Sequence, residues 1–356
     1  MTYKFTNTWP LSLKGYHKRK DSEQVVLAGD IGGTKTMLAL YKVSKGEFTL
    51  LRSQRFSSAS YKGFIDILEE FIQEQEKEAI RHFCLGVAGP VFSNKVNLTN
   101  LNYTIDAEEI AAHFGLDDVT LINDLEATAY GLSLLNPENI RQLIQPEAEP
   151  YGNMAIIAPG TGLGEAGLYF DGTEYHVFPT EGGHCDFAPR TALDMALCNY
   201  LQNKFGVVSV ERLLSGPGIV SIFEFLAEDM ERPVSAQYLE NYHAASDKQK
   251  PAVISTSAVE KKEEVCVEAM EMFVRYLARE ASNLVLKMKA TGGLFIGGGI
   301  PPKILDLLTG DLFRTSFHDA GVMEHLVKKV PVYLIQNEQT ALLGAANYAA
   351  FGAETD

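Results

Sequence analysis

The sequence contains the same short pattern twice: an apolar strand, a turn of glycine and threonine, and a second apolar strand. The first copy is GDIGGTKTMLALY at residues 29–41, and the second is APGTGLGEAGLYF at residues 158–170. Each copy predicts two strands joined by a tight turn. A pattern that recurs within one chain indicates two related domains, and we expect them to face each other across a cleft.

The residues around the first copy extend this prediction. Residues 24–33, 35–43 and 47–56 are three short apolar segments with tight turns between them, which predicts an antiparallel meander. Apolar residues at helical spacing predict a helix within residues 61–81. Strands and helices alternate after that, including a helix at residues 106–114 that Asp106 caps. The order predicts an α/β fold with a mixed sheet flanked by helices.

The second half is expected to repeat the meander and to add a long amphipathic helix at residues 258–289. The predicted boundaries place a small α/β domain at residues 24–134 plus 338–356 and a large α/β domain at residues 135–337. Residues 1–23 are an N-terminal extension, which we expect to be flexible or loosely docked.

Composition restricts the possible partners. The 356 residues suffice for two packed domains, and the formal net charge of -15 argues against nucleic acid or an anionic membrane as the main partner. No apolar run approaches the ~18 residues of a membrane span, and the N-terminus has no signal-peptide core. The cysteines form neither a CxxC pair nor a disulfide scaffold, which favours a cytoplasmic location and no structural zinc. They are Cys84, Cys185, Cys198 and Cys266.

Three glycine-rich turns, at residues 30–36, 160–167 and 297–299, are candidates for binding phosphate. Backbone N–H groups in such turns favour an anion, and glycine permits its close approach. The first turn is not a Walker A loop, because Thr34 replaces the last glycine and a strand follows. The second contains GxGxxG but precedes a hairpin instead of the helix of a dinucleotide site. Any one turn alone is better explained as a hairpin, whereas three turns after apolar strands favour phosphate binding.

Acidic residues near these turns have two possible roles. Asp30 ends a strand beside the first turn, where it either holds magnesium or supports the turn by local hydrogen bonds. Asp124, preceded by Asn123, lies where a strand gives way to a helix. It is either a helix N-cap or a general base for a substrate hydroxyl, and these two roles are compatible.

The segment TEGGHCDF brings Glu181, His184 and Asp186 close together in the sequence. Gly182 and Gly183 break helical geometry and no third ligand is evident, so a loop that offers hydrogen bonds to a polyol is favoured over a metal site. Glu211 begins the helix-like segment ERLLSGPG, where it is also typical of a solvated first turn.

Taken together, these segments resemble the bacterial glucokinases of the hexokinase/actin ATPase superfamily, in the non-ROK group that lacks the zinc-binding cysteine motif. The resemblance runs from about Val25 to about Ala349. It is carried in order by GDIGGTKTMLAL, GVAGPV, LTNLNYTID, LINDLEATAYGL, PGTGLGEAGL, TEGGHCDFAPR, ERLLSGPG, GGLFIGGGIPP and LLGAA.

The resemblance implies two ribonuclease H-like domains with the active site in the cleft between them, ATP with magnesium, and a homodimer. It implies that Asp124 is the catalytic base on the sugar 6-hydroxyl and that Asp30 serves magnesium through water. The implied sugar ligands are Asn123, Asp124, Glu181, His184 and Glu211. The implied ATP-binding residues are Asp30, Gly32, Gly33, Thr34, Gly160, Thr161, Gly162, Gly297, Gly298 and Gly299. The chain departs from the family pattern at Lys35, Leu125 and Thr180.

The predicted reaction is the ATP-dependent phosphorylation of D-glucose to glucose 6-phosphate and ADP. One alternative is a kinase for another hexose, such as mannose or an N-acetyl hexosamine. A second is a non-catalytic sugar-sensing regulator, which the short extension and the acidic charge disfavour. A third is an actin-like ATPase, which has no need of the polar cluster around Asp124 and Glu181.

Overall fold

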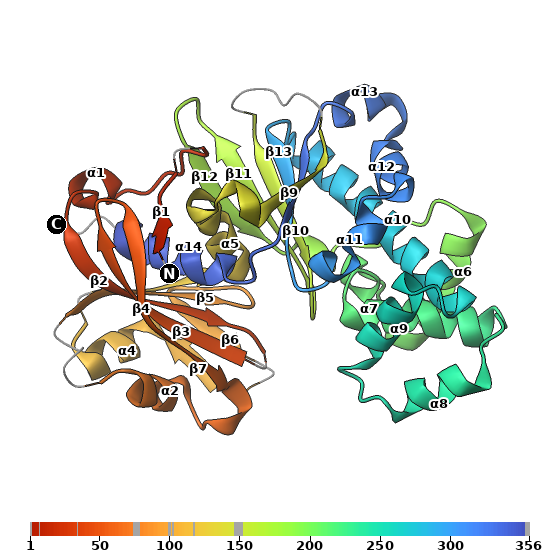
Figure 1. The fold of residues 1–356 in the computed structure, drawn as a ribbon, viewed down its shortest axis with the longest axis horizontal. Helices are drawn as coiled ribbons and strands as arrows, with labels where there is room; N and C mark the ends of the chain where they lie inside the picture. The colour runs from red at the N-terminus through yellow and green to blue at the C-terminus, as the bar shows by residue number, and fades with distance from the viewer. Residues whose placement is uncertain are drawn as a thin grey trace. The chain divides into compact units, whose positions relative to one another are not determined.

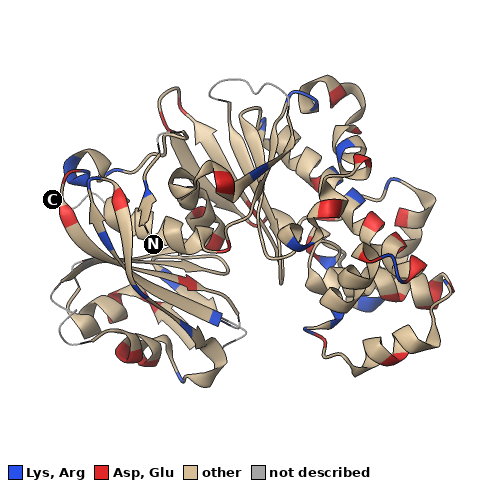
Figure 2. Ribbon diagram, viewed as in Figure 1, with Lys and Arg blue, Asp and Glu red and all other residues tan. Residues whose placement is uncertain are grey.

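The computed structural model describes residues 2–6, 8–33, 35–73, 79–98, 101, 103–116, 118–145 and 152–352. The chain divides into two compact units, which Figure 1 shows in ribbon form. Unit 1 comprises Met1–Ile140, Leu168–Pro179 and Asn337–Asp356, and unit 2 comprises Arg141–Gly167 and Thr180–Gln336. Acidic and basic residues are distributed over the strands and helices of both units (Figure 2).

Unit 1 contains a six-stranded mixed sheet. Its strands β2, β3 and β4 pair antiparallel, which confirms the predicted meander, and β5 and β8 continue the sheet in parallel from β2. The apolar side chains of these strands form the core of the unit with those of two flanking helices. In sheet order the strands are β1 (Thr2–Lys4), β4 (Glu47–Ser57), β3 (Lys35–Ser44), β2 (Glu23–Ile31), β5 (Ile80–Val87) and β8 (Asp118–Asn123).

Helices cover this sheet, and a short ribbon of two strands lies between β5 and β8 in the sequence. The helix predicted within residues 61–81 is shorter than expected: Ile72 has extended backbone angles, and β5 has begun by Ile80. Residues 74–78 lie outside the described residues. The helix with Asp106 as its N-cap is confirmed. The elements are α1 (Tyr16–Arg19), α2 (Phe64–Phe71), β6 (Lys95–Leu98), β7 (Tyr103–Asp106), α4 (Ala107–Phe114), α5 (Asp124–Gly131) and α14 (Thr340–Phe351).

The segment before Val25 is packed against unit 1, so the expectation of a flexible or loosely docked extension is wrong for its described residues. Strand β1 pairs antiparallel with β4 and forms the edge of the sheet. The side chains of Tyr3, Leu11 and Leu13 are 4%, 5% and 4% exposed, respectively. Their burial supplies the hydrophobic stabilisation that a loose tail would lack.

A second six-stranded sheet has the same central order, and most of it belongs to unit 2, whereas its residues 168–179 belong to unit 1. The sequence β4-β3-β2-β5-β8 in the first sheet corresponds to β12-β11-β10-β13-β14 in the second, so the predicted duplication extends to topology. Strands β10, β13 and β14 are parallel, as are β2, β5 and β8. In sheet order the strands are β12 (Tyr175–Thr180), β11 (Leu163–Phe170), β10 (Met154–Pro159), β13 (Gly293–Ile296), β14 (Val332–Ile335) and β9 (Ile140–Ile144).

The helices of unit 2 pack around α10, which is buried along most of its length. The helix predicted at residues 258–289 is interrupted: α9 ends at Val259, Lys261 has a φ of 53°, and α10 starts at Glu264. No helix in the described part of the chain has the length and apolar character that crossing a membrane requires. The helices are α6 (Ala192–Phe205), α7 (Gly216–Glu224), α8 (Ala236–Ala244), α9 (Lys250–Val259), α10 (Glu264–Met288), α11 (Leu305–Leu308), α12 (Asp311–His318) and α13 (Glu324–Val327).

Candidate active site

The carboxyl ends of the three parallel strands of unit 1 bring two predicted site residues to one edge of the sheet. Asp30 on β2 pairs in register with Gly86 on β5, and Val87 pairs with Asn123 on β8. Asp30 and Asp124 therefore lie at the same edge, on either side of β5. Two strand spacings separate β2 from β8, which is about 10 Å.

A hydrogen-bonded cap fixes the start of α5, where Asp124 lies. The Asn123 side chain accepts a hydrogen bond from Leu125 N (2.8 Å), and its backbone N–H donates to Glu126 Oε2 (3.0 Å). This capping box makes Asn123 the N-cap, so the expectation of Asp124 as the cap is wrong. Asp124 is instead the first helical residue.

Asn123 itself is buried, and its amide nitrogen donates to Gly89 O (3.3 Å). Its side chain thus joins the end of β8 to the turn after β5. Gly86 permits close packing of α5 on β5, because a methyl group there would lie 2.9 Å from Ala127 Cβ. Leu125, one of the departures from the family pattern, is buried.

The first glycine turn follows Asp30 directly. Gly32 N donates to Lys35 O (2.9 Å), and buried Thr36 shares a hydrogen bond with Ser58 (3.0 Å). Thr34 lies outside the described residues, and Gly33 is exposed. Burial raises the pKa of the Asp30 carboxyl to about 6. A cation at this carboxylate would oppose that shift by favouring the ionised form.

The second and third glycine turns lie side by side in unit 2. They follow β10 and β13, which are parallel neighbours. The backbone of Gly160 accepts a hydrogen bond from Gly216 N at the start of α7 (2.8 Å), and a Cβ on Gly160 would lie 4.0 Å from Gly299 N. Gly298 requires glycine, because its φ is +85° and a Cβ would lie 2.3 Å from Pro159 O. Gly297 is buried, whereas Thr161 is exposed.

We call residues Thr180–Cys185 the EGGH loop. Its Glu181 and His184 side chains are exposed and lie on one turn, with Glu181 Oε2 and His184 Nε2 4.0 Å apart. The loop is tied to the segment that carries Glu211, because Val210 N donates to Cys185 O (2.9 Å). Asp186 continues this pairing through a bridge to Ser209.

Glu211 connects the EGGH loop to the second glycine turn. It lies in a short 3-10 turn, Val210–Arg212, and not at the start of an α-helix. Its Oε2 accepts a hydrogen bond from Leu163 N (2.9 Å), and a methyl group on Gly162 would lie 2.4 Å from the same oxygen. Unit 2 therefore brings Glu181, His184 and Glu211 close to the turn that contains Gly160 and Gly162.

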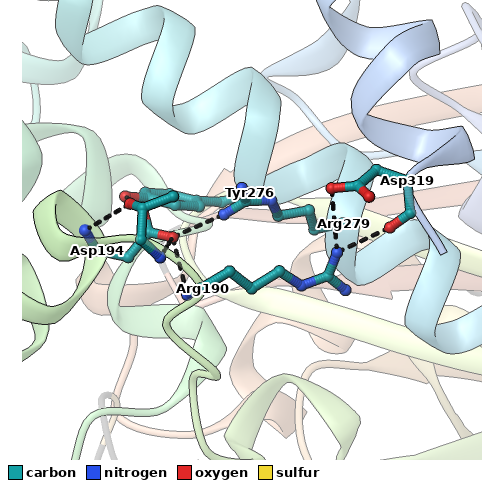
Figure 3. A network of polar contacts seen from close by, with 6 residues as sticks. Arg190, Asp194, Tyr276, Arg279 and Asp319 are labelled. Atoms are coloured by element: carbon teal, nitrogen blue, oxygen red, sulfur yellow. Dashed lines mark hydrogen bonds and ion pairs between the residues drawn. The ribbon is translucent and has the colours of Figure 1, made fainter. Parts of the chain in front are cut away.

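A buried network anchors the segment that follows the EGGH loop, and the sequence interpretation missed it (Figure 3). Asp194 is 1% exposed and accepts hydrogen bonds from Tyr276 Oη (3.0 Å) and Arg279 Nη1 (2.8 Å) of α10. It also accepts from the backbone N–H groups of Arg190 and Thr191, both at 3.0 Å. Burial opposes ionisation, yet these hydrogen bonds lower the pKa of Asp194. Thr191 three residues before Asp194 is a capping-box signal in the sequence.

Comparison with known proteins identifies the family. The family profile described as Glucokinase matches residues 27–351. A glucokinase of Nostoc punctiforme (strain ATCC 29133 / PCC 73102) is 37% identical over 337 residues, which cover 92% of this chain and 99% of the relative. The chain belongs to the glucokinase family. A glucokinase of Synechocystis sp. (strain ATCC 27184 / PCC 6803 / Kazusa) is 36% identical over 91% of this chain and 97% of its own length.

Solved glucokinase structures share the fold. The glucokinase from an Antarctic psychrotroph is 31% identical, with a TM-score of 0.76 over 92% of this chain and 98% of that one. The Balamuthia mandrillaris glucokinase in complex with glucose reaches a TM-score of 0.77 at 21% identity over 92% and 94% of the two chains. The predicted resemblance and the two-domain α/β fold are therefore confirmed, and the protein is an enzyme of the glucokinase family.

Proposed function

We propose that this protein transfers the γ-phosphoryl group of ATP to the 6-hydroxyl of D-glucose, giving glucose 6-phosphate and ADP. Membership of the glucokinase family supports the reaction. The position of Asp124 supports its assignment as the base: a carboxylate at a helix start, held by a capping box, at the sheet edge that also carries Asp30. Phosphoryl transfer needs such a group to orient the hydroxyl and to accept its proton.

In the proposed reaction, Asp124 accepts the proton of the 6-hydroxyl as its oxygen attacks the γ-phosphorus in line. The Gly32–Gly33 and Gly160–Gly162 turns lie against the phosphates, and the Gly297–Gly299 turn borders the adenosine. Glu181, His184 and Glu211 bind the other sugar hydroxyls, with Asn123 contributing its amide. Asp124 belongs to unit 1 and Glu181 to unit 2.

Magnesium fits the donor set that this chain offers. Magnesium bound to a nucleotide usually takes one or two carboxylates, phosphate oxygens and water. Asp30 supplies one carboxylate beside the first turn, and burial raises its pKa to about 6. The described residues hold no cluster of three or more His, Cys, Asp or Glu side chains that could bind a metal by themselves. When bound, magnesium would neutralise phosphate charge, and Asp30 would hold it through water.

The decisive experiment is Asp124→Asn in a coupled assay of ADP release with glucose, ATP and magnesium. The variant should lose most of kcat, by about 10²-fold or more, while glucose still binds, because the amide cannot accept the proton. Asp118→Asn, at the opposite end of β8, is the matched control and should keep kcat within about twofold. Near-normal turnover by Asp124→Asn would overturn the assignment.

The same assay separates the alternatives when it is run across a panel of sugars. Preference for mannose or an N-acetyl hexosamine over glucose would redirect the substrate assignment, and ADP release without any sugar would indicate an ATPase. A ROK-family transcriptional regulator shares the fold at 16% identity, with a TM-score of 0.61. The fold alone does not separate an enzyme from a regulator, and sugar-dependent turnover does. Light scattering in solution tests the proposed homodimer.

A further inference from the structure

A buried carboxyl group lies directly behind the EGGH loop and has no role in the proposed mechanism. It belongs to Glu165 on β11, whose residue is 2% exposed. Its Oε1 is buried and has no hydrogen-bond partner among the described residues. Burying a polar atom in this way costs free energy, so the group calls for a structural or functional reason.

Glu165 contacts the EGGH loop through both its backbone and its side chain. Thr180 Oγ1 donates to Glu165 O (3.0 Å) and also accepts from Gly182 N (3.2 Å). A methyl group on Gly182 would lie 2.0 Å from Glu165 Oε2 and 2.9 Å from its Cδ. The carboxyl group therefore occupies the space that a side chain at position 182 would fill, and it limits how closely the loop approaches β11.

Two charged groups of α10, Glu280 and Lys287, also act electrostatically on Glu165. Lys287 Nζ donates to Glu280 Oε1 (2.9 Å), and Asn283 Nδ2 donates to Glu280 Oε2 (2.9 Å). The Lys287 ammonium group is thus already paired with the carboxylate of Glu280. Burial raises the pKa of Glu165 to about 7, with a further contribution from Glu280 that Lys287 partly offsets. The loop itself carries three titratable groups, all exposed: Glu181, His184 and Cys185.

We propose that Glu165 is a positioning residue that sets the distance of the Gly182 backbone from β11 and thereby places Glu181 and His184 against the sugar. This inference rests on the proposed function of Glu181 and His184 as sugar ligands. Glu165 touches neither sugar nor ATP in this role and acts through Gly182. Substitution of Glu165 should therefore change KM for glucose and not KM for ATP.

A double-mutant cycle tests the contact. Gly182→Ala should raise KM for glucose by about 10-fold or more, because the methyl group meets the carboxyl and displaces the loop. Glu165→Ala should also raise KM, because the loop loses its support. In the double variant the methyl group enters the vacated space, and KM should return to within about threefold of the parent. KM for ATP should stay within about twofold throughout.

Gly183→Ala is the matched control. A methyl group on Gly183 would meet Leu163 O at 2.2 Å, which is backbone, so Glu165→Ala should not rescue this variant. Additive effects of Gly182→Ala and Glu165→Ala, or equal rescue of Gly183→Ala, would overturn the proposal. Failure of the proposed function is a different result, namely that the parent enzyme shows no glucose-dependent ADP release.

The conservative variant Glu165→Gln gives a second measurement that does not depend on how the alanine variants fold. In the parent, loss of the Glu165 proton above about pH 7 places a second negative charge beside Glu280. KM for glucose should then rise several-fold between pH 6 and pH 8. Glu165→Gln keeps the shape but cannot titrate, so its KM should change less over the same range. An identical pH profile in both proteins would contradict the proposed role.

Discussion

The Asp30 carboxyl group lies buried at the carboxyl end of β2. Burial disfavours its negatively charged form. Its pKa is raised from 3.8 to about 6. The folded state therefore binds the proton more tightly than the unfolded state, and the stabilisation present below pH 3.8 is lost as the pH rises through 6. At pH 8 the ionised group lowers the free energy of unfolding by up to about 3 kcal/mol.

Asp30→Asn should consequently be more stable than the parent at pH 8 and show a smaller fall in stability between pH 4 and pH 8. It should also lose kcat by about 10²-fold with magnesium and ATP, because the amide is a poor substitute for a carboxylate near a cation. Urea unfolding at several pH values and the ADP-release assay check both results. Asp229→Asn, an exposed control, should change neither, and a less stable Asp30→Asn would contradict the argument.

Some residues of the candidate site have a signal in the sequence, and others have none. Asp30 and Asp124 could be predicted because each follows an apolar strand. Glu165 could not, because a glutamate in a strand is normally assigned to the exposed face, whereas here it is 2% exposed and lies against Gly182 of the EGGH loop. The N-cap role of Asn123 has a sequence signal, since Glu126 follows three residues later.

Among the elements of unit 1, α5 and α14 pack with their backbones in direct contact. A Cβ on Gly344 would lie 1.6 Å from Ala127 O, and one on Gly131 would lie 2.1 Å from Thr340 O. Asn347 Nδ2 donates to Tyr130 O (2.9 Å) across the same contact. Because α5 begins with Asp124, this packing also determines where the proposed base lies.

Gly344→Ala should therefore lower both stability and activity. Overpacking of this kind typically costs about 1–3 kcal/mol, and the displaced α5 should reduce kcat more than it affects KM for ATP. Thermal unfolding and the ADP-release assay measure the two effects. The matched control is Gly63→Ala, where nothing lies within 4 Å of the added methyl group. If Gly344→Ala is as stable as the parent, α5 and α14 move apart to admit the methyl group without lowering the free energy of unfolding.

Element boundaries were harder to predict than element types. The period of the apolar residues identified α2 and α10, but not the extended angles at Ile72 or the left-handed Lys261. These local backbone conformations end a helix without a proline or glycine signal. The helix ends therefore depend on tertiary packing.

At the scale of the whole molecule, the repeated strand and turn pattern predicted the two sheets, because both copies have the same strand order. It could not predict the helices inserted around β13, from α6 to α13, since they belong to unit 2 alone. The N-terminal segment shows a second limit. Its sequence predicts a flexible or loosely docked extension, yet β1 pairs with β4 and three apolar side chains of the segment are buried.

The N-terminal segment contacts several separate parts of unit 1. Beyond the pairing of β1 with β4, Thr6 N donates to Ser133 O (2.7 Å), Tyr175 N donates to Pro10 O (2.7 Å), and Gly15 N donates to Phe351 O (2.8 Å). The Tyr16 ring packs against Phe351, with centroids 5.2 Å apart. One segment thus joins the first sheet, the 168–179 hairpin and α14.

Leu13→Ala should therefore destabilise the protein by about 2–5 kcal/mol, as for a buried core leucine, and a chain lacking residues 2–13 should lose more. Leu51→Ala is the matched control, because Leu51 is 54% exposed on β4 and should cost well under 1 kcal/mol. Calorimetry of the three proteins decides the question. If Leu13→Ala and Leu51→Ala unfold at the same temperature as the parent, the segment contributes no stability. A selective loss in Leu13→Ala would instead make the segment an integral part of unit 1, because only burial distinguishes the two leucines.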